Sequence, residues 1–133
     1  MSLLEVKKVS RFFGGITAVK DVSFGITKGE ILGLIGPNGA GKTTVFNVMN
    51  GFYPPSRGEV FFKGERISGL KPHQICQRGL ARTFQVVKPL QRMSVLDNVV
   101  ASAFLRARDR KEADAIAADV LNFTALYDDR NVI

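Results

Sequence analysis

One stretch of this sequence constrains the fold more than any other: GPNGAGKT, at residues 36–43. It satisfies the pattern G-x-x-x-x-G-K-[ST], follows the apolar run EILGLIG and precedes KTTVFNVM, which contains no helix breaker. A glycine-rich loop between a buried strand and a helix is the context in which this pattern binds phosphate. The sequence therefore predicts a phosphate-binding loop within an α/β fold.

The residue types of this loop suit a nucleoside triphosphate. Many N–H donors must come close to the phosphates, and Cβ atoms would obstruct them, which explains three glycines in so short a stretch. The start of the following helix favours an anion through its unpaired N–H groups and its dipole. Lys42 adds a positive charge for the β and γ phosphates, and Thr43 adds a hydroxyl for Mg²⁺. We expect Mg-ATP to be bound by Gly36, Asn38, Gly39, Ala40, Gly41, Lys42, Thr43 and Thr44.

Hydrophobic periodicity predicts the strands. LLEVKKVSRFF and ITAVKDVSFGI alternate apolar and charged residues around Gly14-Gly15, which predicts an antiparallel hairpin. EILGLIG is almost wholly apolar and predicts a strand covered on both faces at the centre of a sheet. Further strands are expected at residues 59–63, before a turn at Lys63-Gly64, and over LARTFQ.

Four helices are predicted from caps, breakers and helical spacing. They are KTTVFNVMNGF with a stop at Gly51, PHQICQRG beginning at Pro72, VLDNVVASAFLRAR capped by Ser94, and RKEADAIAADVLNFTALY. The last is amphipathic, with apolar positions at Ala113, Ile116, Ala117, Val120 and Tyr127.

Charge and composition narrow the class of protein without naming a partner. The net charge of +7 favours anionic partners, whether nucleic acid, nucleotide phosphates or a membrane surface. Cys76 is the one cysteine, so an internal disulfide is excluded, and we expect a half-buried thiol. His73 is the one histidine, and we interpret it as a solvated residue at a helix start. No stretch has the length and apolarity of a signal peptide or a membrane span, which predicts a cytosolic chain.

Beyond the loop, the order of motifs resembles the ATP-binding subunits of ABC transporters. Phe13-Gly14, AVKDVSFGITKGE, the loop, a GEV strand and Phe84-Gln85 follow one another as in that family. IGPNGAGKTTVFN with ARTFQ and MSVLDNV is most similar to the ATP-binding subunit of branched-chain amino-acid importers. The resemblance implies an α/β P-loop ATPase fold with an N-terminal antiparallel β subdomain, an incomplete core sheet and the start of a helical subdomain.

The resemblance also implies roles for two residues outside the loop. Phe13 matches the aromatic residue that stacks on adenine, where most members carry tyrosine. Gln85 matches the glutamine whose oxygen reaches Mg²⁺, which helps to position the attacking water, and whose loop senses the membrane subunit. Lys42 and Gln85 are thus the expected catalytic residues, and Thr43 and Gln85 the expected metal ligands.

Several parts of the family pattern do not occur in this sequence. An LSGGQ-type signature, an apolar strand ending in Asp-Glu and a downstream switch histidine are absent, and the chain stops after an amphipathic helix without a closing strand. We therefore expect residues 1–93 to form the N-terminal core with its β subdomain and residues 94–133 to begin the helical subdomain, the rest of the ATPase domain being absent. Such a chain is expected to bind nucleotide with little turnover and to tend to self-associate through an exposed apolar edge.

The resemblance implies partners that the residues alone do not. They are integral membrane permease subunits, a second ATP-binding subunit and, indirectly, a solute-binding protein, at the cytoplasmic face of the inner membrane, with no nucleic acid expected. Two alternatives remain open at this point: an ABC-type ATPase that acts on nucleic acid, motivated by the positive charge, and a nucleotide-binding chain without hydrolysis.

Overall fold

The computed structural model describes residues 2–133. Contacts divide them into two units, the first ending at Arg82 and the second comprising Thr83–Ile133, and each unit is described by itself. The predicted boundary between residues 93 and 94 concerns subdomains of the family fold and stays a prediction.

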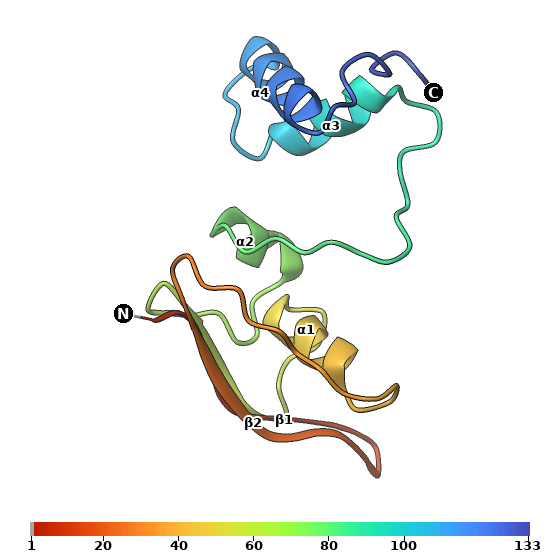
Figure 1. Cartoon of the computed structure of the whole chain (residues 1–133). Coiled ribbons are helices and arrows are strands. Elements are labelled where there is room, and N and C mark those ends of the chain that lie inside the picture. Colours follow the sequence, from red (N-terminus) through yellow and green to blue (C-terminus); the bar gives the residue numbers. More distant parts are fainter. Residues whose placement is uncertain (1) are drawn as a thin grey trace. The chain divides into compact units, whose positions relative to one another are not determined.

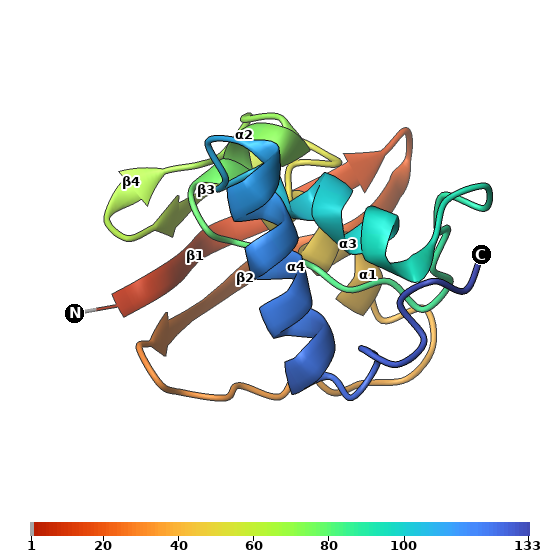
Figure 2. The ribbon, with the colours of Figure 1, turned by 90° about the horizontal axis from the view of Figure 1, so that it is seen from above.

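The first unit is built on one antiparallel sheet (Figure 1), and its strands follow the order β2-β1-β3-β4 (Figure 2). Its strands are β1 (Ser2–Phe13), β2 (Ile16–Thr27), β3 (Arg57–Phe62) and β4 (Glu65–Arg66). The predicted hairpin is confirmed as β1 and β2, and the chain returns as β3 along the other edge of β1, where Val6 faces Val60. This part of the molecule is therefore organised around β1, which has a neighbour on each side.

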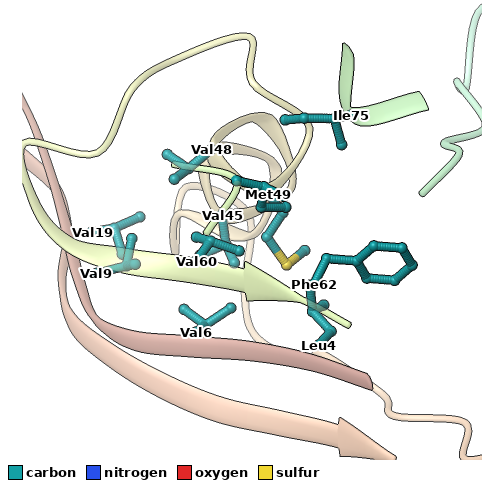
Figure 3. Close-up of a cluster of buried hydrophobic side chains, with 11 residues drawn as sticks. Leu4, Val6, Val9, Val19, Val45, Val48, Met49, Val60, Phe62 and Ile75 are labelled. Atoms are coloured by element: carbon teal, nitrogen blue, oxygen red, sulfur yellow. The ribbon is translucent and has the colours of Figure 1, made fainter. Parts of the chain in front are cut away.

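Helix α1 (Lys42–Met49) covers one face of this sheet, as Figure 3 shows. Val45, Val48 and Met49 lie at the i, i+3 and i+4 positions of its buried stripe and point toward the strands. Helix α2 (Pro72–Gln77) adds Ile75 to the same cluster. We call this cluster the first-unit core: Leu4, Val6, Val9, Val19, Val45, Val48, Met49, Val60, Phe62, Ile67 and Ile75. It fixes the helix that follows the glycine-rich loop against β1 and β3.

The second unit holds two helices, α3 (Val95–Ala103) and α4 (Arg110–Phe123), which pack side by side (Figure 2). Ser94 caps α3 as predicted, its hydroxyl accepting a hydrogen bond from the backbone N–H of Asp97 at 3.1 Å. Arg110 lies 2.7 Å from Asp114 and 3.3 Å from Asp97, and these carboxylates, Asp114 first, raise the pKa of its guanidinium. Charge pairing thus adds to the apolar contact between the two helices.

Two helix predictions in the second unit need correction. The helix after Ser94 ends at Ala103, five residues before the predicted Arg108, because the chain turns back there and α4 then packs on Val100 and Ala103. On α4 the buried stripe is Ala113, Ala117 and Leu121, an i, i+4, i+8 row. Val120, predicted on that face, is 44% exposed instead.

Two predicted strands are not formed. Residues 30–36 and 80–85 take part in no strand ladder among the described residues. Ile31 is 98% exposed and Ile35 is 93% exposed, although their apolar pattern predicts burial. A strand covered on both faces forms only when neighbouring strands supply hydrogen-bond partners, and the sheet β2-β1-β3-β4 of the described chain includes neither segment. The fold class is nevertheless as predicted, including its incomplete core sheet.

Candidate nucleotide site

The glycine-rich loop leads directly into α1, with Gly41 as its N-cap residue. Gly39 and Gly41 have φ angles of 83° and 91°, in the left-handed region that favours glycine. A Cβ atom on Gly41 would also collide with the carbonyl oxygen of Ala18 in β2. The loop therefore requires glycine at Gly41 for two independent reasons, its backbone conformation and its contact with the sheet.

The start of α1 offers unpaired donors to an anion. The first helical bond runs from the N–H of Val45 to the carbonyl of Gly41 at 3.0 Å, so the N–H groups before Val45 have no helical acceptor. No side chain caps this end, and its first turn contains no acidic residue. Unpaired N–H groups and the positive end of the helix dipole therefore meet at one exposed point.

Lys42 lies over the loop that precedes it. Its Nζ donates to the carbonyl oxygens of Gly36 at 2.5 Å and Pro37 at 2.7 Å. No carboxylate in residues 2–133 pairs with this ammonium group. An anionic ligand could therefore exchange two neutral acceptors for charged oxygens, which form stronger hydrogen bonds with an ammonium group.

The hydroxyl of Thr43 suits Mg²⁺ as a protein oxygen ligand of a phosphate-bound ion. Thr43 is exposed at the second position of α1. The described residues contain no group of three or more His, Cys, Asp or Glu side chains that could hold a metal. Mg²⁺ prefers oxygen ligands and commonly keeps waters and phosphate oxygens alongside one or two from the protein. The loop fits this ion when phosphate comes with it.

Phe13 ends β1 at the same end of the hairpin as the loop. Its partner in β2 is Ile16, two residues before Ala18, where the backbone of Gly41 approaches the sheet. At the rise of a strand, two residues span roughly 7 Å. The ring is 37% exposed, so part of its surface is open to a ligand. This geometry is compatible with the predicted stacking role, which stays a prediction.

The other candidate residues lie away from the loop in the chain. Gln85 is exposed on an irregular segment of the second unit, so its place in the same site stays a prediction. His73 is exposed at the second position of α2, as predicted for a solvated residue. Cys76 is half-buried and is not in a disulfide.

Comparison with known proteins assigns the family. Residues 19–132 match the model of the ABC transporter family, and that range is most of the chain. The chain belongs to the ABC transporter family. The site residues of the loop thus lie inside the matched region.

Curated relatives of this ABC-family chain carry branched-chain amino-acid transport in their names. A probable branched-chain amino acid transport ATP-binding protein LivG from Archaeoglobus fulgidus is 45% identical over 100 residues, which is 75% of this chain and 39% of the relative. The high-affinity protein LivG of Escherichia coli strain K12 is 43% identical over the same shares. The chain thus spans less than half the length of the curated relatives it matches.

Solved structures of ATP-binding cassettes share its fold. A nucleotide-free ATP-binding cassette from an ABC transporter matches with a TM-score of 0.85 at 28% identity, covering 99% of this chain and 57% of that one. The ADP conformation of such a cassette matches equally well, with a TM-score of 0.85. In the described part of this chain, no helix has both the length and the apolarity needed to cross a membrane.

Proposed function

We propose that this chain is the nucleotide-binding part of an ABC importer's ATP-binding subunit, and that residues 36–44 bind the triphosphate of Mg-ATP. The observation that carries the proposal is the loop itself. Gly41 is required by its backbone conformation and its contact with the sheet, the start of α1 has unpaired N–H groups, and Lys42 has no carboxylate partner among the described residues. The ADP-bound cassette of the same fold supports a nucleotide as the ligand.

Each part of the site has a separate task in this proposal. The N–H groups of α1 and the Lys42 ammonium bind the β and γ phosphates, Thr43 holds Mg²⁺, and Phe13 stacks on the base. When bound, the metal ion neutralises phosphate charge. Gln85 orients the water whose oxygen bonds to the γ phosphorus, while the bond from that phosphorus to the bridging oxygen breaks and ADP and inorganic phosphate leave. The proton that the water loses would pass to the general base, which is expected outside this chain.

Hydrolysis of ATP is proposed for the whole protein, and little turnover is proposed for this chain alone. Phosphoryl transfer requires a positioned water and neutralisation of the developing charge. The sequence contains neither an LSGGQ-type signature nor an apolar strand ending in Asp-Glu, and its match covers 39% of a curated relative. The general base and the signature segment of a second subunit are expected outside this chain.

The transport role rests on the relatives. Their names support an importer of branched-chain amino acids or a related small polar solute, with permease subunits and a second ATP-binding subunit as partners. A solute-binding protein would act indirectly, and we expect no nucleic-acid partner. The subunit would lie at the cytoplasmic face of the inner membrane.

A phosphate-release assay tests the division between binding and turnover. The chain is incubated with saturating Mg-ATP, and inorganic phosphate is measured over many binding half-lives. The proposal predicts nucleotide bound to the loop and negligible release of phosphate. Robust release that Lys42→Ala abolishes would show that this chain already holds the full set of catalytic groups, and the proposed division would be wrong.

A further inference from the structure

Three side chains from two separate segments meet at the end of β1, where Phe13 is the last residue of the strand. Phe13 and Tyr53 contact each other edge to face, with ring centroids 5.1 Å apart and planes at 80°. The guanidinium carbon of Arg11 lies 4.6 Å from the Phe13 centroid and 5.4 Å from the Tyr53 centroid. Arg11 therefore contacts both rings as a cation over an aromatic face.

Arg11 is held in place by groups other than a carboxylate. Its Nη1 donates to the carbonyl oxygen of Pro54 at 2.9 Å. Its Nε is buried with no hydrogen-bond partner in the part of the chain that the structure describes. Burying an N–H donor without a hydrogen-bond partner costs free energy. Here the electron-rich faces of the two rings stabilise the positive charge of the Arg11 guanidinium. The guanidinium is thus fixed between the two rings and fixes them in turn.

The segment that carries Tyr53 is tied to both α1 and β1. The N–H of Tyr53 donates to the carbonyl of Asn47 in α1 at 3.3 Å. Ser56 donates its N–H to the carbonyl of Ser10 at 2.8 Å and accepts from the N–H of Phe12 at 3.1 Å. Hydrogen bonds to both α1 and β1 therefore hold the segment of Tyr53 at the end of β1, and a ligand would meet a prepared pair of rings.

We propose that Arg11 and Tyr53 are positioning residues for the base of a purine nucleoside triphosphate, acting by holding the Phe13 ring. The inference rests on the proposed function. Phe13 and Tyr53 are each 37% exposed, so the pair is anchored yet accessible. A ring already fixed in one orientation loses less side-chain freedom when a base stacks on it. A cation on the ring also draws π density away from it, which favours contact with an electron-rich purine.

The test compares a ligand that has a base with one that has none. Mg-ATP and Mg-tripolyphosphate are titrated calorimetrically into the chain and into Tyr53→Ala, Tyr53→Phe and Arg11→Gln. Because an aromatic contact of this kind is lost, Tyr53→Ala and Arg11→Gln should weaken ATP binding about two- to tenfold and leave tripolyphosphate binding unchanged. Tyr53→Phe retains the ring and should bind ATP like the unaltered chain. Phe123→Ala, which removes an aromatic ring that is 91% exposed on α4, is the matched control and should change neither affinity.

A spectroscopic signature separates ring positioning from a general structural effect. The sequence contains no tryptophan, so Phe13→Trp introduces a single reporter at the base. ATP should quench its fluorescence, and adding Tyr53→Ala should weaken the ATP dependence of that quenching. The inference is overturned if Tyr53→Ala leaves ATP affinity unchanged or weakens both ligands equally. A wrong proposed function would give a different result. The unaltered chain would then bind neither Mg-ATP nor Mg-tripolyphosphate, or Lys42→Ala would bind both ligands with the same affinity as the unaltered chain.

Discussion

Two apolar runs flank the glycine-rich loop, and the run after the loop is buried whereas the run before it is exposed. After the loop, Val45, Val48 and Met49 are only 4%, 3% and 7% exposed, because β1 and β3 lie against α1. Before the loop, Ile31 and Ile35 are 98% and 93% exposed. The patterns predict burial equally well. The difference shows that an apolar pattern indicates only that a segment favours burial. Whether the segment is buried depends on whether partner elements are present in the same chain.

The largest effect is expected when the same substitution is made at a buried isoleucine that packs in the cluster with α1 and at an exposed isoleucine of the run before the loop. Ile75 is 1% exposed in the first-unit core, and Ile35 is 93% exposed. Because only the first deletion leaves a cavity, Ile75→Ala should lower the free energy of unfolding by about 2–5 kcal/mol. Ile35→Ala should change it by less than about 0.5 kcal/mol.

Urea denaturation followed by circular dichroism measures both variants against the unaltered chain. Equal losses would mean that residues 30–36 are packed in solution and that the contrast is wrong. A stabilised or less associated Ile35→Ala would agree with the expectation that this exposed segment promotes self-association.

Two glycines extend the comparison to the backbone. A Cβ on Gly41 would meet the carbonyl oxygen of Ala18, and Gly41 has a φ of 91°, whereas a Cβ on Gly33 would meet no other part of the chain within 4 Å. Gly41→Ala should therefore cost about 1–3 kcal/mol through backbone strain, with a corresponding loss of Mg-ATP affinity. Gly33→Ala should leave both stability and affinity unchanged. Thermal unfolding and calorimetric titration measure the two effects, and a Gly41→Ala chain that binds like the unaltered one would refute the proposed loop geometry.

The smallest effect on stability is expected at Glu30, where residues 30–36 follow β2. Glu30 accepts hydrogen bonds from the N–H of Thr27 at 2.7 Å and from its hydroxyl at 2.8 Å, and these bonds, the backbone one first, lower the pKa of its carboxyl group. A lowered pKa stabilises the folded chain above the ordinary carboxyl pKa and loses that contribution as the pH falls through the lowered value. Glu30→Gln should therefore lower the melting temperature slightly at neutral pH, and the difference from the unaltered chain should shrink as the pH falls below the ordinary carboxyl pKa. A difference that grows on acidification would contradict this sign.

Local signals were enough to predict much of the fold from the sequence. The hairpin, the start of α1, the cap at Ser94 and the phosphate loop all depend on residues that are close together in the chain. The strands at residues 30–36 and 80–85 were predicted wrongly because a strand also depends on distant neighbours. The buried face of α4 likewise depends on tertiary packing, because Leu121 is 1% exposed whereas its neighbour Val120 is 44% exposed.

The candidate site likewise contains residues that the sequence predicts and residues that only the tertiary contacts reveal. The loop residues follow from one motif, and the role of Phe13 from a family resemblance. Arg11 and Tyr53 were missed because their contact joins β1 to a segment after α1, far along the chain. One signal was available, since Arg11 and Phe13 are two residues apart and so share a face of the strand.

Whether residues 36–44 bind nucleotide is best decided by titrating Mg-ATP into the chain, into Lys42→Ala and into Lys28→Ala. Lys28 is an exposed lysine in the turn after β2 and serves as the matched control. The account predicts saturable binding that Lys28→Ala preserves and that Lys42→Ala weakens by at least about tenfold, since a charged hydrogen bond to phosphate is lost. Equal affinity in all three chains, or no binding to the unaltered chain, would show that residues 36–44 are not a nucleotide site.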